Sequence, residues 1–198
     1  DTGCCQDSAF AIAAAFGMAS ILSVLVLGDE SGYETGEVQK VKLAAIEAEW
    51  NTEPAPASFT LFGIPNQEEM RTDYAIKIPY ALGIIATRSL DGQVTGLKDL
   101  KSEHEVRVRS GMTAYDLLTK LQSGDKSDET RARFDEVKQD LGYGLLLKRY
   151  TANVTDATDD QIKAAVDDSI PQVLPLFFAF RIMVACGMLM LVLIGLAF

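Results

Sequence analysis

Residues 9–27 read AFAIAAAFGMASILSVLVL, a run of about 19 residues without a charged side chain. At about 1.5 Å of rise per residue, a helix of this length crosses the ~30 Å hydrocarbon core of a bilayer. A second run, VLPLFFAFRIMVACGMLMLVLIGLAF at residues 173–198, is apolar except for Arg181. Neither run has the polar face that a core helix of a water-soluble protein usually shows. The two runs therefore predict two membrane-spanning helices.

The rest of the chain has the composition of a water-exposed polypeptide. The whole sequence holds 18 Lys and Arg against 28 Asp and Glu, a net charge of −10, which argues against a nucleic-acid partner. We expect a mainly α-helical membrane protein with two spans flanking a largely helical loop domain. The acidic charge favours an extracytoplasmic position for this domain, although loops of this length cross membranes regardless of their charge. Because the chain starts without Met and ends within an apolar run, we expect it to be an internal fragment. The expected parts are a flank (1–8), a transmembrane helix (9–27), a polar loop domain (28–172) and a second transmembrane helix (173–198).

Apolar residues at helical spacing among charged ones predict three helices in the polar middle. They are residues 37–50, 97–121 and 128–141. Gly111 is a candidate interruption of the second helix, and the glycines at 142 and 144 are expected to end the third. Thr158–Gln161 matches a capping box and predicts the start of a further short helix.

Turn formers and short apolar strings predict the remaining structure. Gly28–Tyr33 is rich in turn-forming residues and predicts a turn where the chain leaves the membrane. Phe59–Pro65 and Tyr74–Ile85 are short, apolar and interrupted by Pro or Gly, so we expect extended or irregular structure there.

Arg181 and Met183 lie two residues apart in the second apolar run. A cation within a spanning helix is costly, so it has a partner or extends its long side chain to the interface, and position alone leaves both open. Met183 offers a thioether of the kind that ligates haem iron, but Met188 and Met190 share its helix, and packing explains all three more simply. The single histidine, His104, lies among charges in the polar middle, where we expect it to be solvated.

Lys42 and Glu47 fall within the predicted helix 37–50. Five residues place them about 140° apart around an α-helix, so they do not form a salt bridge on one face. Spacing alone favours two solvent-exposed charges.

Several long strings resemble subunit I of the bacterial cytochrome bd quinol oxidases. In order they are LGDESGYE (27–34), QKVKLAAIEAEW (39–50), FTLFGIP (59–65), IPYALG (78–83), DLGYGLL (140–146) and FAFRIMVACG (178–187). The likeness runs from about Phe10 to the end of the chain, and the length and order of the strings make it specific. One departure is the stretch Cys4-Cys5-Gln6-Asp7, where the family usually has basic residues before the first span.

The resemblance implies that residues 28–172 are the family's long quinol-binding loop, on the periplasmic side of the bacterial inner membrane. It implies that Lys42 and Glu47 bind ubiquinol or menaquinol and serve its oxidation, with Asp29 as a further quinol-binding candidate. It also implies that Met183 is an axial ligand of the iron in a low-spin haem b, with Arg181 beside that haem. The other haem ligand, a high-spin haem b, a haem d, subunit II and possible small accessory subunits are implied outside this chain.

The implied activity is that of a quinol:oxygen oxidoreductase. Electrons would pass through the low-spin haem b to an oxygen-reducing haem pair, and proton motive force would be generated without a pump. The fragment alone is expected to be inactive. The alternative is a membrane-anchored sensor or receptor with an extracytoplasmic ligand-binding domain and no redox chemistry. Arg181 and Met183 separate the two, since a sensor has no need of them.

Overall fold

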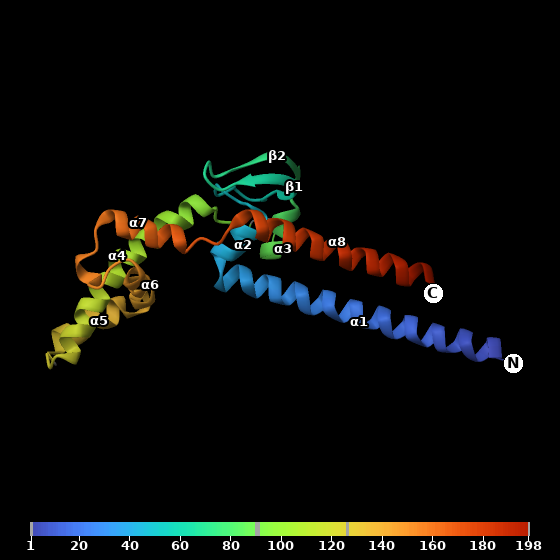
Figure 1. Ribbon diagram of the computed structural model, residues 1–198, viewed down its shortest axis with the longest axis horizontal. Helices are drawn as coiled ribbons and strands as arrows, with labels where there is room; N and C mark the ends of the chain where they lie inside the picture. The colour runs from blue at the N-terminus through green and yellow to red at the C-terminus, as the bar shows by residue number, and fades with distance from the viewer. Residues whose placement is uncertain (1, 90–91, 126, 198) are drawn as a thin grey trace. The chain divides into compact units, whose positions relative to one another are not determined.

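The computed structural model describes residues 2–89, 92–125 and 127–197, and it divides the chain into two compact units (Figure 1). Unit 1 comprises the chain up to Thr95 and from Gln172 onward, and unit 2 comprises Gly96–Pro171. The side chains of Cys4-Cys5-Gln6-Asp7 lie outside the described part, and the expectation about this flank stays a prediction.

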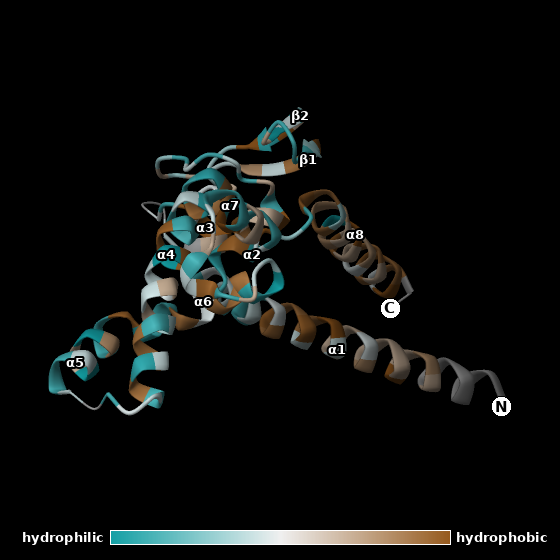
Figure 2. Cartoon of the chain, turned by 60° about the vertical axis from the view of Figure 1, so that its left-hand side comes forward, coloured by the Kyte–Doolittle hydropathy of each residue, from teal (hydrophilic) through white to brown (hydrophobic). Residues whose placement is uncertain are grey.

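Two long helices, α1 (Thr2–Val38) and α8 (Val173–Ala197), dominate unit 1. Both hold a stretch long and apolar enough to cross a membrane, as their composition predicted, and Figure 2 shows the brown of apolar residues along them. A β-carbon added to Gly17 would lie 3.2 Å from Ile194 Cδ1, and one added to Gly195 would lie 4.0 Å from Met18 Cε. The middle of α1 therefore packs against the last turns of α8, and Figure 1 shows the two helices running in opposite directions.

The first helix continues beyond its apolar run. The predicted turn at Gly28–Tyr33 is wrong, because these residues are helical. Glycine within a helix costs about 1 kcal/mol relative to alanine, so local preference opposes this extension. Contacts from Arg88 oppose that cost: its Nη2 lies 2.8 Å from Asp29 Oδ2 and 2.7 Å from Glu30 Oε2. The helix therefore continues through Gly28 and Gly32 in spite of their low helix propensity.

Helix α2 (Lys40–Glu47) follows a break at Gln39, where φ is −126° and ψ is 59°. The helix predicted over 37–50 is thus correct only in its centre, because its first two residues belong to α1. Ala48 ends α2 in the left-handed region, with φ 52° and ψ 41°. Small buried residues, Ala44 and Ala45, let α2 pack closely against its neighbours α1 and α8.

A two-stranded antiparallel hairpin follows, made of β1 (Phe59–Asn66) and β2 (Arg71–Ile78). The extended structure expected for 59–65 is confirmed. The extended or irregular structure expected for 74–85 holds as far as Tyr80, because β2 and a turn precede α3 (Ala81–Thr87), which is helical. In Figure 1 the hairpin lies beside the beginning of α8, and β1 contacts that helix.

In unit 2 the backbones of two helices touch at a pair of glycines. Helix α4 (Leu97–Gln122) runs through Gly111 without the interruption considered above. A β-carbon on Gly111 would lie 2.3 Å from the backbone nitrogen of Gly144, which is closer than real contacts allow. The helix end expected at 142–144 is also wrong, because these residues lie within α6 (Leu141–Leu146). The glycines serve close packing and not helix termination.

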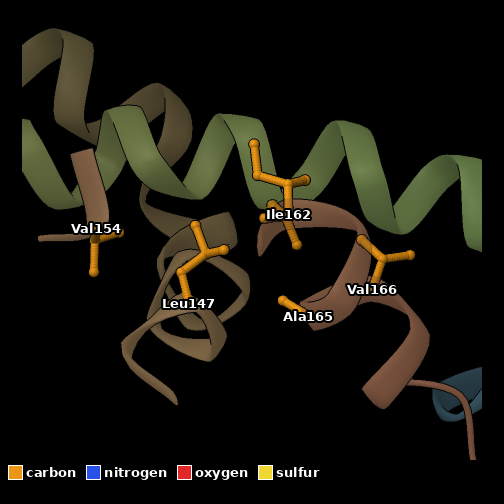
Figure 3. Close-up of a cluster of buried hydrophobic side chains, with 6 residues drawn as sticks. Leu147, Val154, Ile162, Ala165 and Val166 are labelled. Carbon is orange, nitrogen blue, oxygen red and sulfur yellow. The ribbon is translucent and has the colours of Figure 1, made fainter. Parts of the chain in front are cut away.

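The remaining elements of unit 2 are α5 (Asp128–Val137), the 3-10 turns η1 (Lys138–Asp140), η2 (Leu147–Arg149) and η3 (Val154–Asp156), and α7 (Asp159–Asp168). Of these, η2, η3 and α7 close a small apolar core against α4, whereas α5 and η1 contribute no buried residue. The predicted capping box of α7 is confirmed, with Thr158 and Gln161 bonding each other's backbone. Figure 3 shows the core: Leu147, Val154, Ile162, Ala165 and Val166.

The expectation that His104 is solvated is wrong. Its Nδ1 lies 2.9 Å from Ser169 Oγ, and its ring centroid is 5.1 Å from that of Tyr143. Burial lowers the pKa of this imidazole below its ordinary value, against the attraction of Glu103 and together with the repulsion of Arg107. A half-buried neutral His104 is therefore part of the packing of α4.

Candidate functional site

The guanidinium of Arg181 is held entirely by protein groups. Its side chain projects from α8 towards α2 and β1 and is only 12% exposed. Every N–H has an acceptor within hydrogen-bond reach, since Nε, Nη1 and Nη2 each meet two oxygen atoms. The carbonyl acceptors belong to Ile46, Thr60, Leu61 and Phe177. The Thr60 carbonyl accepts twice, and the fifth acceptor is a carboxylate oxygen of Glu47, 3.1 Å from Nη2.

Glu47 lies at the last turn of α2 and is 4% exposed. Helix α2 buries Ala44 and Ala45 and contacts α8. Glu47, at the end of the same helix, is buried with them and faces α8. Burial raises the pKa of this carboxyl to about 7, although the charge of Arg181 and its hydrogen bond act in the opposite direction. Near neutral pH the group therefore exchanges between its ionised and protonated forms. The surface position favoured by spacing is wrong for Glu47.

Glu49 is a second buried carboxyl, which the sequence reasoning missed. It is 4% exposed and follows the left-handed residue Ala48, and its backbone N–H donates to the Ala44 carbonyl over 2.8 Å. Burial raises its pKa to about 7, the nearby charges of Glu53 and Glu47 add to this, and Lys77 partly offsets it. The available signal was the pairing of two glutamates around an alanine just before Trp50, in an otherwise apolar stretch.

Glu53 differs from Glu47 and Glu49 because its pKa is lowered, and unlike Glu49 its carboxylate is paired. Lys77 Nζ hydrogen-bonds its Oε1, and the other oxygen accepts from Ser58 Oγ at 2.7 Å and Ser58 N at 3.2 Å. Burial acts against its charge, but the hydrogen bonds from Lys77 and Ser58 outweigh burial and hold the pKa of Glu53 below its ordinary value. This group therefore stays ionised and lies at a more exposed position than Glu49.

The structure brings together only Glu47 and Arg181 of the five predicted site residues. Lys42 is exposed on α2, away from the buried pair. Asp29 lies on α1 and pairs with Arg88. Met183 is 62% exposed on α8, and two residues of helix place it about 200° around from Arg181, on nearly the opposite face.

Met183 fits the role of an axial haem ligand. Its thioether is exposed and accepts no hydrogen bond within the described ranges, and its neighbours Ile182 and Val184 are apolar. Arg181 fits the side of a haem less simply, because binding a propionate would require exchanging one of its present acceptors. Elsewhere in the described part of the chain, three or more His, Cys, Asp or Glu residues nowhere gather in a way that could hold a metal ion.

Residues 3–198 match the sequence model of the family described as cytochrome bd terminal oxidase subunit I. The chain is 47% identical over 182 residues to "Cytochrome bd-II ubiquinol oxidase subunit 1" of Escherichia coli (strain K12), covering 92% of this chain and 35% of the relative. It is 32% identical over 96 residues to "Cytochrome bd ubiquinol oxidase subunit 1" of Bacillus subtilis (strain 168), covering 48% and 20%.

A solved structure, the bd oxidase from Geobacillus thermodenitrificans, matches with a TM-score of 0.37 and 22% identity, over 91% of this chain and 45% of that one. Compared with its curated relatives, the chain is short: it spans about a third of the length of the Escherichia coli protein. Because the family's sequence model covers nearly every residue, this chain belongs to the cytochrome bd terminal oxidase subunit I family.

Proposed function

We propose that this chain forms the quinol-oxidising region of a terminal quinol oxidase, with Glu47 as the group that accepts a proton from the quinol. The buried pair of Glu47 and Arg181 carries the proposal, because it joins a carboxyl that titrates near neutral pH to a fixed cation. Both curated relatives are described as ubiquinol oxidase subunits, which supports a quinol as the substrate.

The residue types suit this chemistry. Oxidation of a quinol releases two electrons and two protons, and a carboxylate near the hydroxyl groups accepts a proton as the electrons leave. Arg181 holds the Glu47 carboxylate in one orientation and keeps part of it ionised. Lys42 is the proposed donor to the headgroup oxygens, and since it lies away from Glu47, the headgroup would lie across the edge of α2.

Met183 would hold a low-spin haem b through its sulfur, together with a histidine outside this chain, and such a haem would supply a one-electron acceptor of raised potential. Arg181 would lie beside this haem. Asp29 stays a prediction for quinol binding, since its carboxylate already pairs with Arg88.

The wider setting is part of the same proposal. The complete oxidase would use an oxygen-reducing haem pair and subunit II, and residues 28–172 would lie on the periplasmic side of the inner membrane. Protons released there, combined with proton uptake for oxygen reduction from the other side, would make the reaction electrogenic.

Replacing Met183 by Leu in the complete oxidase tests the haem assignment. Leucine keeps the bulk and apolarity of the side chain but removes the sulfur, so the low-spin haem spectrum should shift or disappear while the protein still inserts into the membrane. Met188→Leu on the same helix is the matched control, because Met188 is similarly exposed, and its spectrum should be normal. An unchanged spectrum in Met183→Leu would make Met183 a packing residue and leave the sensor alternative standing.

A further inference from the structure

Glu49 is a buried carboxyl for which the chain provides no fixed partner. It is 4% exposed, and within the described ranges neither a hydrogen bond nor an ion pair reaches its carboxylate, unlike those of Glu47 and Glu53. An ionised carboxylate without a partner is costly to bury, so a purely structural role would leave this cost unexplained. The residue lies two positions after the proposed proton acceptor.

The carboxylate of Glu49 retains access to water. Every fully buried side-chain oxygen or nitrogen in the described part of the chain has a hydrogen-bond partner. Since the oxygens of Glu49 have none, they make up part of the small fraction of this side chain that solvent still touches. The side chain is thus almost completely buried, but solvent touches its oxygens, as a group that hands a proton to water requires.

Three glutamates, Glu47, Glu49 and Glu53, follow one another along the chain, and the last of them is the most exposed. Glu47 precedes Glu49, bound to Arg181, and Glu53 follows it, bound to Lys77 and Ser58 and more exposed. The Lys77–Glu53 ion pair and the Arg181–Glu47 ion pair therefore flank Glu49 from β2 and α8. Both Glu47 and Glu49 have a pKa of about 7, so a proton moves between them with little difference in free energy. The low pKa of Glu53 means that it does not trap the proton on the way out.

We propose that Glu49 is the proton outlet of the quinol site: it takes the proton from Glu47 and releases it to water beside the Glu53–Lys77 pair. The Glu47 carboxylic acid loses its proton and becomes a carboxylate, while the Glu49 carboxylate gains that proton, directly or across one water molecule. Glu49 then returns to the carboxylate by protonating water. The step resets Glu47 for the next proton and consumes no oxidant. It rests on the proposed role of Glu47 in quinol oxidation.

The test compares Glu49→Gln and Glu49→Asp in the complete oxidase, with turnover measured at varied quinol concentration and pH. Glutamine is nearly isosteric but cannot carry the proton, so kcat should fall about tenfold or more while the KM for quinol and the haem spectrum stay normal. Aspartate should restore most of kcat, which a purely structural role of the glutamate would not predict. The rise of kcat around pH 7 should become shallower in Glu49→Gln.

The exposed glutamate Glu136 supplies the matched control, and Glu136→Gln should have normal kinetics. If Glu47→Gln loses turnover but Glu49→Gln keeps normal kcat, the outlet is wrong and the proposed function survives. If both variants keep normal turnover, the proposed function itself fails. If Glu49→Gln loses its haem spectrum or insertion and Glu49→Asp does not recover kcat, Glu49 is a structural residue and the outlet is overturned.

Discussion

Each unit of the chain contains an arginine bound to an acidic side chain, and the two pairs have different surroundings. In unit 1, Arg181 and Glu47 are 12% and 4% exposed, and the guanidinium lies 3.4 Å from the ring centroid of Phe177. In unit 2, Arg107 and Asp140 join at 2.8 Å with 34% and 13% exposure, and Arg107 also lies over the ring of Tyr143. The contact chemistry is the same, but only the first pair is deeply desolvated on both sides.

This difference decides what each pair does. Removing charges from water costs more than their attraction returns, so burial raises the pKa of Glu47 in spite of Arg181. The half-exposed Arg107 keeps much of its hydration, and its pairing with Asp140 links α4 to the turn before α6. One pair is suited to proton transfer and the other to holding helices together.

The largest expected effect is on turnover. Glu47→Gln keeps the shape of the side chain and an acceptor for Arg181 but removes the proton acceptor, so kcat should fall about 10²–10⁴-fold with a normal haem spectrum. Asp140→Asn makes the equivalent change in the other pair and should leave kcat within about twofold. Steady-state quinol oxidation by the complete oxidase measures both. Equal losses of kcat in the two variants would show that the deeper burial of the Glu47–Arg181 pair does not give it a special role in turnover.

The next effect concerns pH. If Glu47 must be ionised to accept a proton, kcat/KM should rise with pH and level off above about 7, because the carboxyl is protonated below its raised pKa. Arg181→Gln removes the charge that lowers this pKa, so the rise should move up by roughly one to three pH units.

Two variants control for damage to the fold in that experiment. Arg181→Lys retains a cation and should keep the profile closer to that of the wild type, and Arg107→Gln should not move it at all. A profile that stays in place in Arg181→Gln would separate Glu47 from the observed titration.

A smaller effect is expected on stability in unit 2. Gly111→Ala forces a methyl group against the Gly144 backbone, so the helices must separate, at a cost of about 1–3 kcal/mol. Gly142→Ala is the matched control: its β-carbon meets nothing within 4 Å, and the better helix propensity of alanine should be neutral or slightly stabilising. Thermal unfolding measures this, and the pH profile of kcat/KM should not change in either variant. A shifted profile in Gly111→Ala would show that unit 2 acts on the chemistry.

The smallest effect is expected for Lys42→Ala. An exposed hydrogen bond to the quinol headgroup contributes about 0.5–1.5 kcal/mol, so KM should rise roughly two- to tenfold with little change in kcat. Lys163→Ala, an exposed lysine of α7, should leave KM unchanged. A fall in kcat without a change in KM would contradict the binding role of Lys42 and assign it, like Glu47, to the chemical step.

Local patterns predicted the parts of this fold that local physics determines. Two long apolar helices, the central helix α4 and the capping box at Thr158 follow from hydropathy, periodicity and hydrogen bonding within four residues. Glycine at 28, 32, 111 and 144 was expected to break a helix, but all four residues are helical. At 111 and 144 the reason is the close contact between the two glycine backbones, which are distant in sequence. Such contacts cannot be read from neighbouring residues.

The candidate site also depends on contacts between residues that are distant in sequence, which local patterns do not predict. Resemblance gave Glu47 and Arg181 as separate residues, but nothing in the spacing of residues 47 and 181 indicates that they meet. Glu49 escaped notice because its burial follows the left-handed turn at Ala48 and brings it near Lys77 of β2, and neither feature shows in the sequence pattern. The orientation of Met183 away from Arg181, by contrast, follows directly from helix geometry.

The packing of Gly17 against Ile194 also gives an expectation for where the buried ion pair lies relative to the membrane voltage. Because α1 and α8 are antiparallel, and the same number of residues separates Gly17 from Glu30 as separates Arg181 from Ile194, we expect Arg181 to lie level with Glu30. That level is beyond the last residue of the first apolar run, so we expect Arg181 and Glu47 at the edge of the hydrocarbon and not within it. Moving one charge through the full field costs about 2.3 kcal/mol per 100 mV. A proton leaving Glu47 from the edge would cross almost none of that field, so its release should be insensitive to membrane potential, and any voltage dependence of turnover would arise in steps deeper in the bilayer.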